Sequence, residues 1–191
     1  KNTTIKDILK KQEIGTVKKQ DTLENQVNIV YLGLGSNLGN RKINIENAKF
    51  LLNKDDIKVI KFSSYYETKS WPNDNFPKYY NIVLKIETSL SPVSLLNKIK
   101  FIEKKVGRKR AKKNYPRLCD IDILDYSKRV LFLESNGLKL QIPHPRLHYR
   151  NFVLVPLFEI DKNWKHPKFK ENISQLIFKN GLKVLRTIKL I

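Results

Sequence analysis

The sequence predicts an α+β protein with a ferredoxin-like βαββαβ core, followed by additional C-terminal strands and short helices. Residues 27–34, 57–66, 79–87 and 120–126 have the β-branched, aromatic or alternating character of strands. Two segments between these strands repeat apolar residues at helical spacing instead. With 191 residues, 40% of them hydrophobic, the chain is long enough for one domain with a real core.

The first half of the predicted core begins with a buried strand. Residues 27–34 are apolar and run into the turn signal Gly35-Ser36-Asn37, which ends that strand. Residues 57–66 predict the second strand, and residues 67–78, which contain two prolines, predict a loop. Between the two strands, a helix is predicted by the spacing of Ile45, Ala48, Leu51 and Leu52.

The second half of the core begins with a strand at residues 79–87 whose two faces differ. One face has Ile82, Leu84 and Ile86, and the other has Tyr79, Asn81, Val83 and Lys85. The helix that follows has strong end signals, with Ser91 as its N-cap, Pro92 at its first position and Gly107 as its stop. Residues 120–126 then predict the fourth strand of the core.

The segments outside this core are shorter or more polar. Residues 130–142 predict an extra strand and turn, and residues 152–160 and 173–178 predict short helices. Residues 1–26 are polar and Lys-rich, which is typical of an N-terminal extension or an interdomain linker. We therefore expect the functional domain to span residues 27–191.

Composition excludes several classes of protein. No apolar run approaches the roughly 20 residues of a membrane span, and the Lys-rich start lacks the apolar stretch of a secretory signal. The single cysteine, Cys119, excludes an internal disulfide framework and suits a reducing compartment. One cysteine and three histidines also argue against a structural zinc site. We expect a cytoplasmic protein without a membrane partner.

The net charge of +20 has two interpretations, a nucleic-acid surface or a solvated lysine surface. Thirty of the 38 basic residues are lysines spread along the chain, which favours the second. The arginines are more informative, because guanidinium groups bind phosphate and carboxylate in a bidentate manner. Five of the eight predict an anion site in the middle of the chain, within a segment that also contains Arg129: Arg108, Arg110, Arg117, Arg146 and Arg150.

Two carboxylates stand at alternate positions of the fourth predicted strand. Asp120 and Asp122 share one face of that strand, while Ile121 and Ile123 share the other. Two neighbouring carboxylates repel each other, so a divalent cation such as Mg²⁺ or the nearby arginines must compensate. The alternative is a surface strand with two solvated acids.

The segment before these carboxylates, residues 104–117, is basic and has little apolar content. It suits a mobile lid whose arginines close over a polyphosphate, or else a solvated run of charge. His144 lies between Pro143 and Pro145, where it could donate to a phosphate or simply complete a turn. Tyr79 and Asn81 would suit a flat heteroaromatic ligand, although a plain surface pair is the more common outcome for such residues.

One glycine pattern points elsewhere and is set aside. Gly33, Gly35 and Gly39 only loosely match a dinucleotide-binding loop, because the third glycine comes one position late and no parallel-sheet pattern follows.

Several motifs together resemble one enzyme family, 6-hydroxymethyl-7,8-dihydropterin pyrophosphokinase. The resemblance covers roughly residues 27–180, and the combination Pro-Arg-x-x-Asp-x-Asp with Pro-His-Pro-Arg is specific to it. The matching segments are YLGLGSNLGNR from residue 31, SSYYET from residue 63, residues 79–81, Gly107-Arg108, PRLCDIDIL from residue 116 and IPHPRLHYRNFVLVPL from residue 142.

This resemblance implies an activity and its co-substrates. It implies transfer of a pyrophosphoryl group from MgATP to the hydroxymethyl group of the pterin, which gives AMP and the pterin diphosphate used in folate synthesis. It also implies that Asp120 and Asp122 bind two Mg²⁺ ions. The implied partners are these small molecules and not nucleic acid, and fusion to another folate-pathway enzyme is a further possibility.

The resemblance also implies roles for the remaining site residues. Arg108, Arg110 and Arg117 match or flank the catalytic loop arginines that engage the phosphates. Glu103, His144 and Arg150 match positions on the ATP side. The pterin side comprises Thr68, Trp71, Tyr79, Asn81 and Phe152, with the ring stacked between Tyr79 and Phe152.

Two departures from the family pattern lie in the expected mobile parts. Asn114-Tyr115-Pro116-Arg117 replaces the common Trp-Gly-Pro-Arg, and Phe76 replaces a usual Gln. On the pterin side, Trp71 could supply an aromatic contact that the other loop has lost.

Two rival functions remain open. A basic RNA-binding module of the RRM type shares the βαββαβ order, but residues 79–86 lack its Lys/Arg-Gly-Phe motif. A catalytically weak member of a folate-pathway fusion is the other rival.

Overall fold

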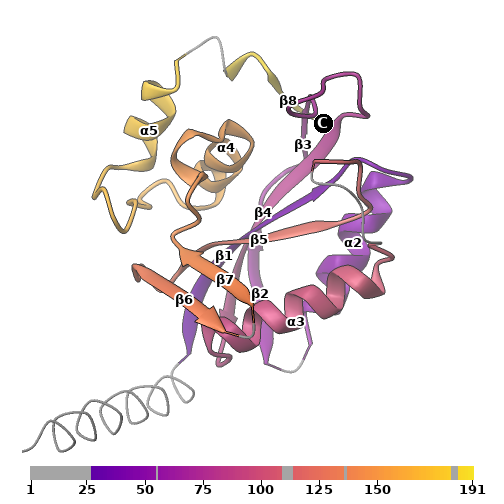
Figure 1. Cartoon of the computed structure of the whole chain (residues 1–191). Helices are drawn as coiled ribbons and strands as arrows, with labels where there is room; N and C mark the ends of the chain where they lie inside the picture. The colour runs from indigo at the N-terminus through magenta and orange to yellow at the C-terminus, as the bar shows by residue number, and fades with distance from the viewer. Residues whose placement is uncertain (1–26, 55, 109–113, 136, 182–184) are drawn as a thin grey trace, which may run out of the picture.

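The computed structural model describes residues 27–54, 56–108, 114–135, 137–181 and 185–191. Residues 1–26, predicted to be an extension or linker, lie outside the described residues. The described chain forms an antiparallel sheet with helices on both faces and a separate two-stranded hairpin (Figure 1). None of its helices is long and apolar enough to cross a membrane.

The main sheet has six strands and confirms the predicted α+β class. Its path is β5 (Asp120–Tyr126), β1 (Asn28–Ser36), β4 (Tyr79–Thr88), β3 (Tyr66–Thr68) and β8 (Ile188–Leu190), and β2 (Ile57–Phe62) also pairs with β4. All pairings are antiparallel, and β1 lies between β4 and β5 over most of its length. The order βαββαβ of the core is therefore confirmed, with one strand divided in two.

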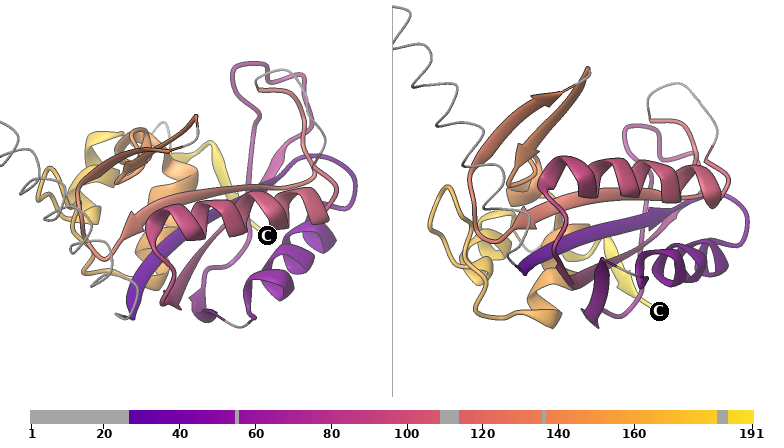
Figure 2. Two further views of the ribbon diagram at one scale, coloured as in Figure 1. Left: turned by 60° about the horizontal axis from the view of Figure 1, so that its bottom comes forward. Right: turned by 90° about the horizontal axis from the view of Figure 1, so that it is seen from below.

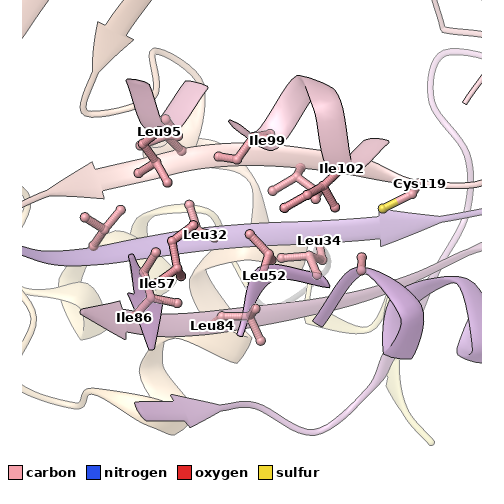
Figure 3. Packing of buried hydrophobic residues seen from close by; sticks show 14 of the residues in the cluster. Leu32, Leu34, Leu52, Ile57, Leu84, Ile86, Leu95, Ile99, Ile102 and Cys119 are labelled. Carbon is pink, nitrogen blue, oxygen red and sulfur yellow. The ribbon is translucent and has the colours of Figure 1, made fainter. Parts of the chain in front are cut away.

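Two helices cover the first face of this sheet. They are α2 (Arg41–Leu52) and α3 (Pro92–Lys105), which contact each other and contribute to one core; both are seen in Figure 2. Leu95, Ile99 and Ile102 of α3 pack against the apolar side chains of β1 and β4 (Figure 3). The end signals of α3 are confirmed, because the Ser91 side chain accepts a hydrogen bond from the backbone N–H of Ser94 and Pro92 begins the helix.

The second face is covered over part of its length by the C-terminal helices. These are α4 (Asn151–Ile160) and α5 (Ile173–Lys179), preceded by the short 3₁₀ turn η1 (Leu147–Tyr149). Their apolar residues pack with Tyr31, Val83 and Leu124 in a second core cluster. The hairpin β6 (Leu131–Ser135) and β7 (Leu138–Ile142) accounts for the strand and turn predicted at 130–142.

The strand predicted at residues 57–66 is wrong in its length. It breaks at Ser63 and Ser64 into β2 and β3, and the following loop begins after Thr68 rather than at residue 67. The Ser63 hydroxyl accepts a hydrogen bond from the backbone N–H of Val83, and the backbone N–H and hydroxyl of Ser64 both donate to Glu159 of α4. The Ser63 N–H still donates to the Val83 carbonyl at 3.0 Å, so at the break Ser63 stays attached to β4 while Ser64 turns to α4. The sequence also gave no prediction of β8.

Candidate active site

The two carboxylates at the start of β5 lie on the face of the sheet that α4 only partly covers. Asp120 and Asp122 alternate with Ile121 and Ile123, whose side chains are buried in the core beneath α2 and α3. The side chains of Asp120 and Asp122 are 32% and 38% exposed. The predicted division of this strand into a core face and a charged face is confirmed.

Two arginines from the preceding segment hold Asp120. Arg108 Nη1 lies 2.7 Å from Asp120 Oδ1, and Arg117 Nη1 lies 3.1 Å from Asp120 Oδ2. Burial by itself would raise the pKa of Asp120, but the charges of Arg117 and Arg108 outweigh it and hold the pKa below its usual value. Asp120 is therefore a carboxylate near neutral pH.

A third carboxylate, Glu103, lies beneath Arg108 and is only 1% exposed. It accepts hydrogen bonds from Arg108, from Lys100 Nζ at 2.9 Å and from the backbone N–H of Ile121 at 2.9 Å. The resemblance assigned Glu103 to the ATP side, whereas its contacts join the end of α3 to the start of β5. Glu103 thus fixes Arg108 relative to the carboxylate strand.

Asp122 has its own basic partners from the segment before α4. Arg150 Nη1 donates to Asp122 Oδ2 at 3.1 Å, and His144 Nε2 lies 3.6 Å from the same oxygen. The Nδ1 atom of His144 accepts the backbone N–H of Arg146, so the ring proton belongs on Nε2. Burial lowers the pKa of His144 and outweighs the attraction of Asp122, so the ring is neutral at pH 7 with an N–H facing the site.

The floor between the carboxylates and strand β4 is formed by glycines of β1. Gly35 pairs with Asp120 on one side and with Asn81 on the other. A Cβ atom at Gly35 would lie 3.2 Å from Asn81 Oδ1 and 3.4 Å from a Tyr79 ring carbon, so a larger residue would push on the two side chains that close over β1 here. The sequence had pointed to Gly33 and Gly35 as part of a discarded dinucleotide loop and to Gly35 as the start of a turn. That turn prediction is wrong by two residues, because β1 continues through Gly35 and Ser36, which pair with Asn81 and Tyr80.

Three of the residues predicted on the pterin side meet on β3 and β4. Asn81 is 5% exposed, and its Nδ2 atom donates to Thr68 Oγ1 at 2.9 Å, which orients the amide. Tyr79 lies on the same face, and burial raises the pKa of its phenol even though Arg117 acts in the opposite direction. Strand β4 therefore presents an aromatic ring and an amide on one face, and Thr68 of β3 fixes the amide.

Three predicted site residues remain: Phe152, Trp71 and Arg110. Phe152 lies at the start of α4, with its ring 5.4 Å from the Arg150 guanidinium carbon. Trp71 is 73% exposed on the loop after β3, so it is not packed against the sheet in this structure. Arg110 falls within residues 109–113, outside the described part of the chain.

Asn37, which the sequence placed only in a turn, links the two loops that border this face. It is 1% exposed, and its Nδ2 atom donates to Ser70 Oγ at 3.1 Å and to the Pro77 carbonyl at 3.2 Å. Its Oδ1 atom accepts the backbone N–H of Arg117 at 2.8 Å, and its own N–H donates to the Arg117 carbonyl. One amide therefore fixes the loop 69–78 and the approach to β5 relative to each other.

The donor set suits a hard cation that is completed by other ligands. Across the described residues there is no group of three or more His, Cys, Asp or Glu side chains placed to hold a metal ion. Mg²⁺ commonly binds through one or two carboxylates together with water and substrate phosphates, which is what Asp120 and Asp122 can offer. The carboxylate pair therefore fits Mg²⁺ bound together with a polyphosphate.

Comparisons with known proteins identify relatives of this chain. Residues 31–162 match the family model described as 7,8-dihydro-6-hydroxymethylpterin-pyrophosphokinase. The 2-amino-4-hydroxy-6-hydroxymethyldihydropteridine pyrophosphokinase of Aquifex aeolicus is 43% identical over 154 residues, which cover 81% of this chain and 93% of that protein. The folic acid synthesis protein fol1 of Pneumocystis carinii is 40% identical over 151 residues, which cover 79% of this chain and 20% of that protein.

A solved structure has the same fold. Plasmodium falciparum HPPK-DHPS, wild type with pteroate, superposes with a TM-score of 0.70 at 17% sequence identity, covering 87% of this chain and 48% of that chain. This chain thus spans about a fifth of the Pneumocystis protein and about half of the Plasmodium chain.

Proposed function

This chain belongs to the 7,8-dihydro-6-hydroxymethylpterin-pyrophosphokinase family, and we propose that its carboxylate face transfers a pyrophosphoryl group from ATP to the pterin. In this reaction the hydroxymethyl oxygen bonds to the β-phosphorus and loses its proton. The bond between the β-phosphorus and the oxygen of the α-phosphate breaks. The products are AMP and the pterin diphosphate, an intermediate of folate synthesis.

The observation that carries this proposal is the gathering of opposite charges at one end of β5. Asp120 lies between Arg108 and Arg117, and Asp122 contacts Arg150 beside His144. Cationic donors suit the oxygens of a triphosphate, and carboxylates suit the cation that accompanies it. A protein that bound only a neutral ligand would have no use for both sets.

We propose that Asp120 and Asp122 hold two Mg²⁺ ions that enter with ATP. When bound, Mg²⁺ neutralises charge on the phosphate oxygens and on the attacking and leaving oxygens. The carboxylates would then exchange their arginine partners for the cations. The arginines that they release would turn to the phosphate oxygens, so no guanidinium group is left unpaired.

The proposed phosphate contacts come from both sides of the carboxylate pair. Arg117 is anchored through its backbone to Asn37, and Arg108 through its side chain to Glu103. His144 presents its Nε2 proton and Arg150 its guanidinium group from the other side of Asp122. These groups would orient the triphosphate so that its β-phosphorus faces the pterin.

On the pterin side we propose that the amide of Asn81 reads the polar edge of the ring. Thr68 accepts a hydrogen bond from its Nδ2 atom, which leaves Oδ1 facing the glycine floor. Tyr79 and Phe152 would stack on the two faces of the ring. Trp71 is exposed in this structure and would have to move to contact the ring.

The decisive experiment is a product assay with the full chain. The protein is incubated with MgATP and 6-hydroxymethyl-7,8-dihydropterin, and AMP and pterin diphosphate are measured. We expect AMP and pterin diphosphate in equal amounts and no AMP without the pterin. Release of ADP instead, or absence of turnover by folded protein, would contradict the proposal, and the second result would favour the catalytically weak relative.

Two further proposals concern the setting of the enzyme. The relatives from Pneumocystis carinii and Arabidopsis thaliana, the latter named a folate synthesis bifunctional protein, are longer than this chain, which supports fusion of such domains to another folate-pathway enzyme. We also propose a cytoplasmic location, since Cys119 is buried and unpaired, which suits a reducing compartment.

A further inference from the structure

Two aromatic side chains from different loops meet beside the candidate site. Phe76 belongs to the loop 69–78 between β3 and β4, and Tyr115 belongs to the segment that leads into β5. Their ring centroids are 5.4 Å apart with an interplanar angle of 52°, which is within the range of attractive aromatic pairs. The pair is therefore a direct contact between the two loops.

On one side, the contact leads to the phosphate-binding groups. The backbone carbonyl of Tyr115 accepts a hydrogen bond from Arg117 Nε at 3.3 Å, and Arg117 Nη1 contacts Asp120 at 3.1 Å. The proline between Tyr115 and Arg117 restricts the backbone that joins them. The position of the Tyr115 ring is therefore tied to the orientation of the Arg117 guanidinium group.

On the other side, the contact leads to the pterin strand. Phe76 precedes Pro77, whose carbonyl accepts hydrogen bonds from Ser70 Oγ at 2.6 Å and from Asn37 Nδ2 at 3.2 Å. Two residues later the chain enters β4 at Tyr79. Any ordering of the loop 69–78 by a bound pterin would therefore act on the Phe76 ring.

We propose that the Phe76–Tyr115 contact couples pterin binding to nucleotide binding by fixing Arg117 in its phosphate-facing orientation. Phe76 and Tyr115 are positioning residues in this scheme, since neither needs to touch a reacting atom. The inference rests on the proposed function, because it takes the two loops to serve the pterin and the triphosphate. Coupling of this kind is reciprocal, so each ligand tightens the other by the same factor.

The experiment measures binding without turnover. Because the reaction breaks the bond between the α-phosphate oxygen and the β-phosphorus, α,β-methylene-ATP with Mg²⁺ binds without transfer. Calorimetry gives its Kd with and without saturating 6-hydroxymethyl-7,8-dihydropterin, and the ratio of the two values is the coupling factor. The variants are Phe76→Ala, Tyr115→Ala, the double variant and Tyr115→Phe, which keeps the ring.

We expect each alanine variant to lower the coupling factor by about two- to tenfold, the range of an aromatic pair. The double variant should lose no more than either single variant, and Tyr115→Phe should keep the wild-type factor. Phe178→Ala is the matched control, because Phe178 is 81% exposed on α5, and its coupling factor should not change. Tyr115 is 46% exposed, so its substitution does not threaten folding.

Three results would overturn the inference: a wild-type factor near one, an unchanged factor in both alanine variants, or additive losses in the double variant. None of these depends on turnover. A wild-type protein that binds both ligands cooperatively yet forms no AMP would contradict the proposed function and leave the coupling in place. Conversely, a wild-type protein that forms AMP, together with alanine variants that keep the full coupling factor, would contradict the coupling and leave the proposed function in place.

Discussion

At the scale of single residues, the guanidinium group of Arg108 is shared between two carboxylates of unequal burial. Asp120 is partly exposed and open to exchange of partners, whereas Glu103 is almost fully buried and also accepts the backbone N–H of Ile121. A buried carboxylate with three donors is costly to break, so Glu103 remains a fixed anchor. Arg108 can therefore exchange Asp120 for a phosphate without losing its attachment to α3.

The first prediction concerns the carboxylates themselves. Asp122→Asn should lower kcat about 100-fold or more, because it removes a cation ligand that acts on charge developing in the transition state. The free energy of unfolding should change by less than about 1 kcal/mol, because Asp122 is partly exposed and the core face of β5 is untouched. AMP formation and urea unfolding measure the two effects. An active variant would remove Asp122 from the proposed metal site.

The second prediction separates the two arginines. Arg117 is held at its backbone by Asn37 without any ligand present, so Arg117→Ala should weaken nucleotide binding about tenfold or more. Arg108 follows Gly107, whose φ of +102° marks the end of α3, and it should act mainly when both substrates are bound. Arg108→Ala should therefore lower kcat about 100-fold with the nucleotide Kd within about threefold of wild type.

Nucleotide affinity from calorimetry and turnover from AMP formation distinguish these two arginines. Equal losses of affinity in both variants would mean that they form a static phosphate clamp. The proposed action of Arg108 only when both substrates are bound would then be wrong.

At the scale of elements, the break between β2 and β3 sets the geometry of the pterin side. After the break, β3 pairs with β4 so that Thr68 lies opposite Tyr79 and Tyr66 lies opposite Asn81. The carboxylate of Glu159 holds this start of β3, because it accepts hydrogen bonds from Ser64 and from the hydroxyl of Tyr66 at 2.8 Å. Helix α4 thus positions a strand that is distant from it in sequence.

The third prediction tests this clamp. Glu159→Ala should lower the free energy of unfolding by only about 1 kcal/mol, because the carboxylate is exposed to solvent. It should raise the KM for the pterin several-fold through the loosened Thr68 and Asn81, with the nucleotide Kd unchanged. Hydrogen exchange at Tyr66 and Thr68 should become faster. Glu134→Ala, on the separate hairpin, is the control and should leave all of these unchanged.

The sequence predicted the elements whose signals are local. Helix α3 has a cap, an initial proline, an apolar stripe and a glycine stop within one stretch, and β5 was located with its exact bounds. The charged members of the site were predictable for the same reason, because Asp120 and Arg117 belong to one short motif. The contacts of Asn37 with Arg117 and of Glu159 with Ser64 span 80 and 95 residues, so no local pattern could reveal them.

At the scale of the whole molecule, the two faces of the sheet are stabilised differently. The face under α2 and α3 is a continuous apolar core, whereas the layer of α4 and α5 combines apolar packing with buried polar groups. Asp125 is fully buried and accepts a hydrogen bond from the indole of Trp164 at 2.8 Å. His166, also buried, stacks on Phe169 with ring centroids 4.4 Å apart. This second layer also carries Arg150, so its stability bears on the site.

The last prediction is that this layer makes the protein sensitive to acid. Burial, with the nearby charges of His148 and Lys168, lowers the pKa of His166 to about 4, although Glu171 acts in the opposite direction. In the unfolded chain the pKa is about 6.5, so the unfolded state binds the proton first. A group with a depressed folded-state pKa stabilises the protein above the unfolded value, and that contribution is lost as the pH falls from about 6.5 toward 4.

Urea unfolding at pH 7, 6 and 5 should therefore show a loss of about 2 kcal/mol that is due to His166. The comparison is His166→Asn, whose side-chain oxygen can accept the backbone N–H groups of Lys168 and Phe169 as Nδ1 does now, at 3.2 Å each. The variant cannot take up a proton, so its stability should fall less steeply over this range. His144 and Asp125 titrate in both proteins and cancel in the difference. Parallel pH profiles for the two proteins would show that His166 titrates normally in the folded state and that the acid sensitivity arises elsewhere.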